Sequence, residues 1–339
     1  MKLSIIIVSW NIQKLTQKCV ESIFAFIKNI DLEIFVVDNN SADDTVKILE
    51  KYKTENTLDN LNIIVNKENV GFAKANNQAL KMLWETSPYP LLSKEGSLKT
   101  SALAPDKAES LEIPVLPLTK GEIKRGSYIL LLNPDTEFVD DKIKKALEFM
   151  ENNPEIGILG PKLLNTDDSL QRSCRRFPNF LDQLFIQLKF YNFFPNRIKA
   201  TREYFMLDFE HNENREVDQV MGAAMLIKRE VVEKVGLLDE KFWAIFEEVD
   251  FCQRTKNVGY KIFFYASWQI YHHKEQSFGQ WPALRKQINF NHSLYHYFKK
   301  HKPFWQLFLL WLVQPINLLL TWIDVAVGIR KKAGKSKDT

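Results

Sequence analysis

Short apolar runs alternate with amphipathic stretches over the N-terminal half of the chain. The runs at 3–8, 33–37, 62–65 and 129–132 are rich in Ile, Val and Leu, which is typical of parallel strands covered on both faces. Between the first two runs, apolar residues recur at helical spacing, namely Leu15, Cys19, Ile23 and Phe26. A strand, a helix and a strand form a βαβ unit with a right-handed crossover. The pattern therefore predicts an α/β fold with a mostly parallel central sheet flanked by helices.

Further elements are predicted from turn and capping residues. Ser41 and Asp44 have the spacing of a capping box, which predicts the start of a helix. Asp140 and Asp141 are expected in the first turn of another helix, where they complement its dipole. The stretch 217–236 predicts a strand with small residues at a tight point, followed by a helix that ends at Gly236.

The periodic pattern breaks down between residues 84 and 127, where Pro, Ser, Lys, Glu and scattered Leu replace it. So long a stretch without periodicity is more often an insertion than part of a core. We predict a flexible insertion without a catalytic role. The alternative is a lid or a loop that docks a partner.

The segment 304–329 is apolar and aromatic, but polar residues and a proline interrupt it. A membrane-spanning helix needs about 20 mostly apolar residues, and an Asp at mid-membrane costs about 2.5–3.5 kcal/mol. Basic residues on both sides favour an interfacial helix on anionic lipid instead. A helix packed on the core or in an oligomer is the alternative. The predicted organisation is one catalytic domain at 1–300 and a helical, membrane-associating segment at 301–339.

Charge and cysteine content narrow the range of partners and compartments. The net charge of +4 over 339 residues is small, and acidic residues are spread among the basic ones, so we expect no nucleic-acid partner. Three widely separated cysteines match no metal-ligand spacing and favour a reducing, cytoplasmic setting. The N-terminal apolar run is too short for a signal peptide.

Polar residues follow several of the predicted strands: Ser9 and Asn11, Asp38 and Asn39, Asn66, and Asn133 with Asp135. Ligands of open parallel sheets bind beyond the carboxyl ends of the strands, so four such coincidences predict a binding crevice. A single Asp of this kind is more often a helix cap or turn residue. Neither a dinucleotide fingerprint nor a P-loop is present. A divalent metal, Mg²⁺ or Mn²⁺, between Asp135 and a diphosphate would neutralise the phosphates instead.

Several ordered motifs together resemble a known family: VSWN, VVDNNSADDT, NKENVGFAKANNQAL, LLLNPDTEF, LQRSCRRFP, FEEVDFCQR and HHKEQS. They resemble those of the inverting family-2 glycosyltransferases with the GT-A fold, in the bacterial rhamnosyltransferase-like branch. The resemblance runs from Lys2 to about Ser277, without the insertion and the C-terminal segment.

The resemblance implies a binding role for many of these positions. Asp38 would contact the nucleotide base, and Ser9 and Asn11 would help to line that pocket. The residues placed along the nucleotide sugar are Asn39, Gly71, Phe72, Ala75, Asn76, Asn133 and Arg172. Asp135 and His272 would hold the metal, with Asn133 replacing the first carboxylate of the family's Asp-x-Asp motif. His273 is expected to be structural.

The resemblance also implies a catalytic base in FEEVDFCQR. Inverting transfer needs a carboxylate that takes the proton of the acceptor hydroxyl. Glu248 occupies the position of the family's Asp base, and Glu247 and Asp250 are alternatives. The non-catalytic alternative is that these acids complement a helix N-terminus, with Asp250 and Arg254 as an i,i+4 pair. The sequence does not indicate which arginine of 172–176 points into the site.

The sequence therefore predicts a metal-dependent transfer of a hexosyl group, rhamnose from dTDP-rhamnose being the leading example. The acceptor would be a polysaccharide or a lipid-linked glycan at the inner face of the plasma membrane, and the protein would associate peripherally with the membrane. Two rival hypotheses are a sugar nucleotidyltransferase and a nucleotide-sugar-binding protein without activity.

Overall fold

The computed structural model describes residues 1–85, 126–194, 197–274, 276 and 278–327. The strands are β1 (Lys2–Ser9), β2 (Asp31–Asp38), β3 (Leu61–Val65), β4 (Ser127–Leu132), β5 (Thr136–Phe138), β6 (Ile156–Leu164), β7 (Leu170–Gln171), β8 (Cys174–Arg175), β9 (Arg215–Val217), β10 (Gln219–Val220), β11 (Ala224–Lys228) and β12 (Lys261–His272). The helices are α1 (Gln13–Phe26), α2 (Thr45–Glu55), α3 (Phe72–Glu85), α4 (Ile143–Asn152), α5 (Phe180–Gln187), α6 (Phe190–Phe193), α7 (Lys199–Tyr204), α8 (Arg229–Val235), α9 (Glu247–Asn257), α10 (Ala283–His301) and α11 (Phe304–Ala326), with a 3₁₀ turn at Phe278–Gln280.

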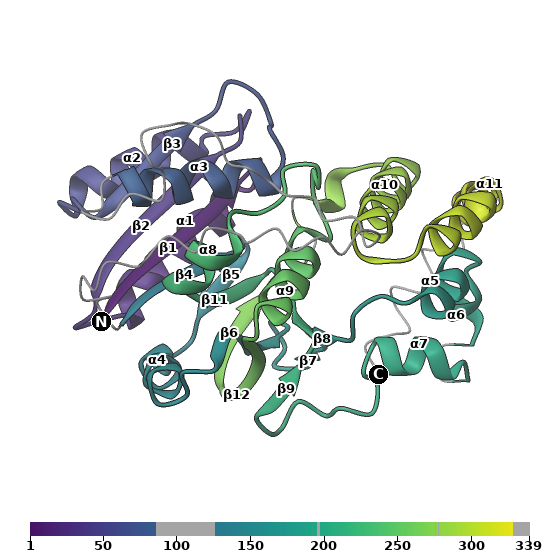
Figure 1. Cartoon of the computed structure of the whole chain (residues 1–339). Coiled ribbons are helices and arrows are strands. Elements are labelled where there is room, and N and C mark those ends of the chain that lie inside the picture. The colour runs from purple at the N-terminus through teal and green to yellow at the C-terminus, as the bar shows by residue number, and fades with distance from the viewer. Residues whose placement is uncertain (86–125, 195–196, 275, 277, 328–339) are drawn as a thin grey trace.

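The central sheet has the strand order β3-β2-β1-β4-β11-β6-β12-β5 (Figure 1). The first four strands are parallel, as the sequence predicts. The other half of the sheet is mixed, because β11 runs antiparallel to both β4 and β6. The sheet is therefore less uniformly parallel than expected, although its α/β class agrees with the prediction.

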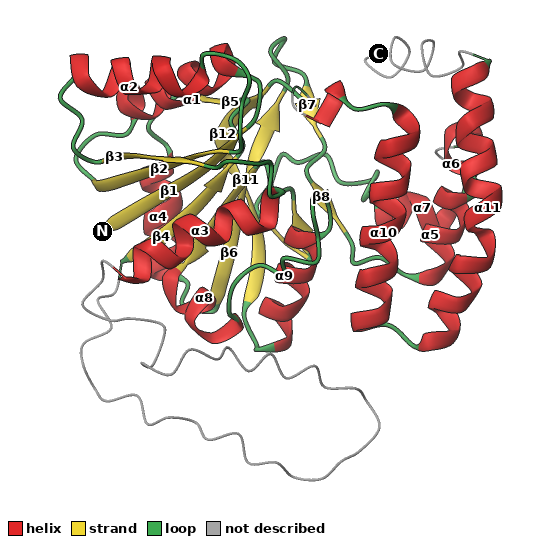
Figure 2. Cartoon of the chain, turned by 90° about the horizontal axis from the view of Figure 1, so that it is seen from above, coloured by secondary structure: helices red, strands yellow, loops and turns green. Residues whose placement is uncertain are grey.

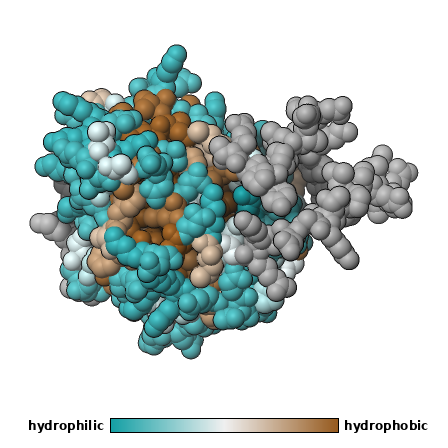
Figure 3. All heavy atoms as spheres, turned by 90° about the vertical axis from the view of Figure 1, so that its left-hand side faces the viewer, coloured by the Kyte–Doolittle hydropathy of each residue, from teal (hydrophilic) through white to brown (hydrophobic). Residues whose placement is uncertain are grey.

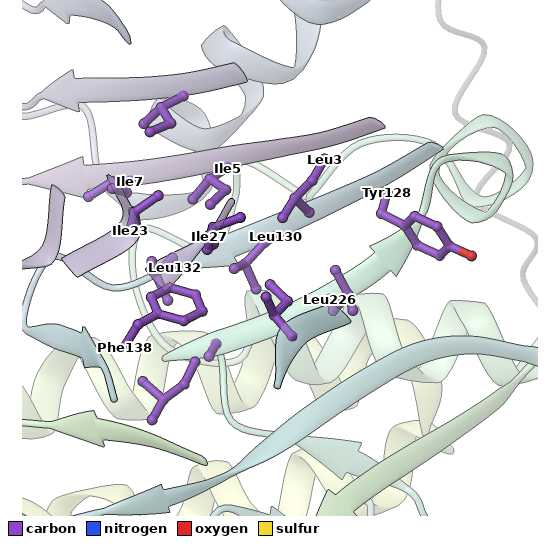
Figure 4. Packing of buried hydrophobic residues seen from close by; sticks show 14 of the residues in the cluster. Leu3, Ile5, Ile7, Ile23, Ile27, Tyr128, Leu130, Leu132, Phe138 and Leu226 are labelled. Atoms are coloured by element: carbon purple, nitrogen blue, oxygen red, sulfur yellow. The ribbon is translucent and has the colours of Figure 1, made fainter. Parts of the chain in front are cut away.

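Both faces of the sheet are covered by helices (Figure 2). Alternate residues of β1 enter different clusters: Leu3, Ile5 and Ile7 pack with α1, α2 and α4, whereas Ile6 and Val8 pack with α3, α8 and α9. Figure 4 shows part of the first cluster, where side chains of α1 meet those of the sheet. Burial on two faces explains why these strands are continuous apolar runs rather than alternating ones.

Three local predictions differ from the structure. Ser41 does not cap α2, because its hydroxyl accepts a hydrogen bond from the backbone N–H of Asn11, and Asp44 makes no side-chain cap. Asp140 and Asp141 lie before α4 rather than in its first turn, since the chain only becomes helical at Ile143. The expected strand within 217–228 is divided into β10 and β11 at residues 221–223.

The last two helices form an antiparallel hairpin that packs against α5 beside the sheet domain (Figure 1). Helix α11 is long and apolar enough to cross a membrane, by length and composition only. The predicted domain boundary at residue 300 falls in the last turn of α10, and this division stays a prediction. Most of the predicted insertion at 84–127 lies outside the described residues.

Candidate active site

A cleft of about 340 Å³ opens beyond the carboxyl ends of β1, β2 and β4. It is lined by Val8, Trp10, Asn39, Asn69, Phe72, Asn133, Pro134, Asp135, Met221, Gly222, Ala223, Trp243, Ala244, Ile245, Glu247, Glu248, His272, Gln276 and Trp281. The strand ends, the start of α3 and the start of α9 all contribute to this surface. The cleft thus lies where an open parallel sheet is expected to bind its ligand.

One corner of the cleft joins Asp135 to His272. The antiparallel pairing of β5 with β12 sets His272 opposite Thr136, and this register brings the imidazole beside Asp135. Nε2 of His272 lies 3.3 Å from Oδ1 of Asp135 and 3.5 Å from Nδ2 of Asn133. Both Asp135 and His272 are almost fully buried. Asn133, Asp135 and His272 thus converge at one point, although His272 is far from the other two in the sequence.

Gln171 fixes the orientation of the His272 ring. Its Nε2 donates to the backbone carbonyl of His272 at 2.6 Å, so its Oε1 is left to accept from Nδ1 at 2.9 Å. A proton on Nδ1 leaves Nε2 as a free acceptor that faces Asp135. An outer partner of this kind commonly orients a metal-binding histidine. Gln171 lies on the short strand β7, within the motif LQRSCRRFP, but the sequence analysis gave no role to this residue of the motif.

The donor set of this corner fits a divalent cation that is shared with a ligand. Within the described residues, no group of three or more His, Cys, Asp and Glu side chains could hold a metal. One carboxylate and one imidazole nitrogen leave several coordination positions for phosphate oxygens and water, as is usual for Mg²⁺ or Mn²⁺ at phosphate sites. The imidazole favours Mn²⁺ over Mg²⁺, because magnesium prefers oxygen ligands.

Asp38 has one carboxylate oxygen without a partner. Its Oδ2 accepts a hydrogen bond from the backbone N–H of Ser41, whereas its buried Oδ1 has none. An unsatisfied buried acceptor is costly unless a ligand completes it. Ser9 and Asn11 have structural partners instead: Ser9 is bonded to Thr16, and Asn11 bonds to Ser41 and to the N–H of Ala42. Asp38, Ser9 and Asn11 are not among the residues that line the cleft, although their neighbours Val8, Trp10 and Asn39 are.

The predicted residues of the α3 region divide into two groups. Asn39 and Phe72 line the cleft, whereas Gly71, Ala75 and Asn76 do not. Gly71 has a φ of +86°, and a Cβ there would lie 2.6 Å from the carbonyl oxygen of Trp243. That carbonyl also accepts a hydrogen bond from the N–H of Phe72 at 2.7 Å. The glycine therefore allows close approach of the segment that precedes α9, which is a contact within the chain.

Glu247 and Glu248 begin α9, directly after two residues in the left-handed region. The φ angles of Ile245 and Phe246 are 72° and 75°. A β-branched residue in this region is rare, and backbone strain of this kind concentrates at functional sites. The carbonyl of the preceding Ala244 accepts hydrogen bonds from two side chains of α10, Asn289 and Ser293. Helix α10 thus helps to hold the turn that presents both acids to the cleft.

The carboxyl groups of Glu247 and Glu248 are incompletely paired. The Oε2 atom of each is buried without a hydrogen-bond partner. Burial, followed by the charge of Glu248, raises the pKa of Glu247 well above its ordinary value. Burial also raises the pKa of Glu248, and the charge of Arg175 opposes this rise. Two adjacent acids with perturbed pKa values in a cleft indicate a functional site.

Asp250, three residues further on, faces α10. It contacts Arg254 at 2.8 Å, His301 at 2.7 Å and Lys300 at 2.8 Å. Burial alone would raise its pKa, but the hydrogen bond from His301 and the charges of Arg254 and Lys300 lower the pKa to about 2. Asp250 does not line the cleft. The Asp250–Arg254 pair of the non-catalytic alternative is therefore present, and all three acids lie in the first turn of α9, but only the two glutamates line the cleft.

The arginines of residues 172–176 point in different directions. Arg172 donates to the backbone carbonyl of Phe209 at 2.7 Å and does not line the cleft. Arg175 stacks over the ring of Phe205 and is near enough to Glu248 to influence its pKa. Arg175 is therefore better placed than Arg172 to act on the site.

Three tryptophans that were not predicted as site residues line the cleft, namely Trp10, Trp243 and Trp281. The rings of Trp243 and Trp281 lie 4.7 Å apart, and the guanidinium of Arg285 lies 3.9 Å above Trp281. Flat apolar rings of this kind suit a nucleobase or the apolar face of a sugar. Trp10 belongs to the motif VSWN, and Trp243 stands just before the motif FEEVDFCQR, so their nearness to quoted motifs was the available signal.

Comparison with known proteins shows what the chain is similar to. Residues 4–83 match the sequence model described as "Glycosyl transferase family 2". The chain is also 25% identical over 211 residues to N-acetylglucosaminyl-diphospho-decaprenol L-rhamnosyltransferase of Mycobacterium tuberculosis, which covers 62% of this chain and 68% of that protein. Residues 4–83 thus carry the sequence pattern of the family-2 glycosyltransferases. The chain resembles the rhamnosyltransferases, as its motifs predicted.

A second similar protein is named for the transfer of a different sugar, glucose. The chain is 25% identical over 289 residues to poly(ribitol-phosphate) beta-glucosyltransferase of Bacillus spizizenii, which covers 77% of this chain but only 42% of that protein. The chain thus spans less than half the length of this larger relative.

Solved glycosyltransferase structures share the fold. A mannosyltransferase from Pyrobaculum calidifontis, in complex with GDP-Man and Mn²⁺, matches 97% of this chain and 75% of its own with a TM-score of 0.52 and 14% identity. GalNAc-T7 with UDP, GalNAc and Mn²⁺ matches 80% of this chain and 44% of its own with a TM-score of 0.50 and 13% identity. At these identities the likeness shows the fold alone, which is of the GT-A type.

Proposed function

We propose that this glycosyltransferase transfers a hexosyl group from a nucleotide-sugar donor to an acceptor hydroxyl with inversion at the anomeric carbon. The observation that carries the proposal is the pair Glu247 and Glu248, each with a buried carboxylate oxygen that lacks a partner, at the rim of the cleft. An unpaired carboxylate is what a direct displacement needs as its base.

In the proposed step, Glu248 accepts the proton of the acceptor hydroxyl. The hydroxyl oxygen forms a bond to the anomeric carbon, and the bond from that carbon to the donor's diphosphate oxygen breaks. The electron pair of the broken bond leaves with the nucleoside diphosphate. The products are a glycoside of opposite anomeric configuration, the free nucleoside diphosphate and a protonated Glu248, which returns its proton to water.

The different surroundings of the two glutamates decide which of them is the base. Neighbouring carboxylates do not readily carry two charges together, so one of the pair holds its proton more tightly. Burial and its neighbour's charge raise the pKa of Glu247, whereas Arg175 favours the charged form of Glu248. Glu247 therefore stays protonated, and Glu248 is available as the base. The longer arm of Glu248, compared with the family's Asp, is accommodated beside Gly222, where a hypothetical Cβ would lie 3.5 Å from that of Glu248.

The donor's diphosphate would lie at the corner formed by Asp135 and His272. These two residues would hold a divalent cation there, with Asn133 beside them and Gln171 fixing the imidazole. Such a cation neutralises the charge that develops on a departing diphosphate. The nucleoside would extend towards Asp38, whose unpartnered Oδ1 is suited to accept from a base or ribose.

The choice of donor sugar and acceptor is supported by the similar proteins. The likeness to a rhamnosyltransferase supports dTDP-rhamnose as the first donor to test, and the likeness to a glucosyltransferase keeps UDP-glucose in the panel. The acceptor would be a cell-envelope polysaccharide or a lipid-linked glycan. We place the protein in the cytoplasm, at the inner face of the plasma membrane and peripherally associated with it.

The test is release of nucleoside diphosphate from a panel of nucleotide sugars, with Mn²⁺, with Mg²⁺ and with EDTA. Metal-dependent release from one donor, abolished in Asp135→Ala and Glu248→Gln but retained in the exposed control Glu213→Gln, supports the proposal. Donor binding without turnover in the presence of membrane lipid extract would overturn it in favour of a binding protein. Formation of a nucleotide sugar from a sugar phosphate would identify a nucleotidyltransferase instead.

A further inference from the structure

The helices α5, α10 and α11, which we call the C-terminal helical unit, are polar where they meet. Their buried polar side chains are Gln183, Gln187, Gln287, Asn291, Ser293, Asn317 and Thr321. Asn291 donates to Oδ1 of Asn317 at 2.9 Å, and Asn317 donates to the carbonyl of Gln187 at 2.7 Å. One asparagine thus ties all three helices together.

The outward side of α11 is apolar along its whole length. Its exposed large side chains are Phe304, Trp305, Phe308, Leu309, Trp311, Leu312, Ile316, Leu319, Trp322, Ile323 and Val325. The only charged residue of the helix, Asp324, is buried against the unit. The opposite side of the molecule, over α2 and β3, differs, because hydrophilic side chains surround the apolar ones there (Figure 3). Continuous exposed apolar surfaces of this size mark an interaction site.

We propose that this outward side of α11 inserts into the interfacial layer of an anionic membrane, with the helix axis in the membrane plane. Exposure of this apolar surface to water is unfavourable, and its burial among lipid chains is favourable. Trp is enriched at the membrane interface. Charge supports the same partner at both ends of the helix. Lys299 and Lys302 precede the helix, whereas Lys300 and His301 between them are paired with Asp250. Five of the last ten residues of the chain, 330–339, are Lys or Arg, with a single Asp. Basic residues near a surface attract anionic lipid.

The neighbours of α11 argue against a membrane-spanning arrangement, although its length would allow one. Helix α10 runs antiparallel beside it and exposes Arg285, His292 and Lys299 along its length. Lys300 of α10 is also paired with Asp239 and Asp250 of the catalytic part. A spanning α11 would bring these charges into lipid or separate from Asn291 and lose its buried hydrogen bonds.

Docking through α11 also orients the cleft, a step that rests on the proposed function. Helix α10 starts just after Trp281, which lines the cleft, and α11 returns antiparallel to it (Figure 2). The last turns of α11 therefore lie at the end of the hairpin nearest the cleft. An acceptor carried by a membrane lipid would be presented beside the site rather than on the far side of the protein.

Vesicle co-sedimentation of the full chain tests the surface without any sugar donor. We expect binding to vesicles of phosphatidylcholine with phosphatidylglycerol, and weaker binding to phosphatidylcholine alone. Leu319→Glu and Trp311→Glu should each reduce the partition coefficient by about tenfold or more. The control Val258→Glu, at an exposed apolar position elsewhere, should leave it unchanged. Equal loss in all three variants, or no vesicle binding by the wild type, would overturn the proposal. Sedimentation of the wild type as a dimer that Leu319→Glu dissociates, without vesicle binding, would assign the surface to a second copy.

Depth-dependent quenching tests the in-plane orientation. The native cysteines Cys19, Cys174 and Cys252 are buried, so a fluorophore can be attached selectively to Trp305→Cys, Leu312→Cys or Trp322→Cys. Lipids with quenchers at two depths should report the same shallow depth for all three labels. A middle label much deeper than the outer two would instead establish a spanning helix. Donor hydrolysis in solution by Leu319→Glu separates the outcomes, because it reports on the proposed function whether or not the membrane surface is correct.

Discussion

Helix α9 carries carboxylates on two sides that have opposite environments. On the cleft side, Glu247 is buried and Glu248 is half-buried. Each has one buried oxygen that lacks a hydrogen-bond partner, and their pKa values are raised. On the side facing α10, Asp250 is fully buried but surrounded by Arg254, Lys300 and His301, and its pKa is lowered. All three acids lie in the first turn of the same helix.

The difference separates a chemical role from a structural one. The helix N-terminus favours negative charge at all three positions, so the dipole does not distinguish them. Cationic partners do distinguish them, because they stabilise the charged form of Asp250 and make it a poor proton acceptor. A carboxylate that is left without partners is more costly to the fold, and it is the one that can still accept a proton from a substrate.

Replacement of the cleft acid should have the largest effect on turnover. We expect Glu248→Gln to lower kcat by about 10²–10⁴-fold, the usual contribution of a general base. The free energy of unfolding should not fall, because the neutral side chain removes the cost of burying a charge at this position. Steady-state kinetics and urea unfolding of the same preparation measure both. A variant that keeps its turnover would transfer the role to Glu247.

Replacement of the paired acid should instead affect folding. Asp250→Ala leaves Arg254 and His301 without their buried partner, and removal of one member of such a pair costs about 3–5 kcal/mol. Urea unfolding measures this loss, with Glu216→Ala as an exposed acidic control. Unchanged stability together with lost turnover would reverse the assignment of the two sides.

The pH dependence of stability should have opposite signs for the two sides. The raised pKa values of Glu247 and Glu248 mean that the folded chain binds protons more tightly there, so their contribution to stability falls as the pH rises above the ordinary value of 4.5. Asp250, with a pKa of about 2 instead of 3.8, contributes stability above its ordinary pKa that is lost as the pH falls towards 2.

Unfolding of the metal-free protein across the pH range resolves these contributions. A tenfold difference in proton affinity between the folded and unfolded chain corresponds to about 1.4 kcal/mol in the free energy of unfolding. Glu248→Gln should flatten the decline above about pH 4.5, and Asp250→Asn should flatten the acid limb. Identical curves for wild type and both variants would contradict the comparison.

The smallest effect is expected from a partner at the edge of the Asp250 cluster. Lys300 is partly exposed, so Lys300→Met should lower the free energy of unfolding by only about 0.2–1 kcal/mol. His301 is more buried, and His301→Ala should cost more than Lys300→Met. Urea unfolding of the two variants, with the double variant to complete a cycle, measures the difference.

The sequence predicted the strands and the convergence at the cleft better than the direction of individual side chains. The resemblance implied that Asp135 and His272 lie together, and they meet because β5 pairs with β12. Asp250 was not separable from Glu248 by sequence, since its partners come from a helix about 50 residues later in the chain. Arg172 and Arg175 differ for the same reason, because tertiary packing sets Arg172 against the carbonyl of Phe209 and Arg175 near Glu248.

The two ends of β4 have different consequences for engineering. The cleft lies at its carboxyl end, whereas the chain leaves the described residues at Glu85 and returns at Gly126 near its amino end. There the carbonyl of Gly126 accepts from the N–H of Lys2, and Trp84 lies beside Ser127. Six strand residues span about 20 Å. A reporter domain or an affinity handle spliced between residues 85 and 126 would therefore be attached near the amino end of β4, at the opposite end of that strand from the cleft.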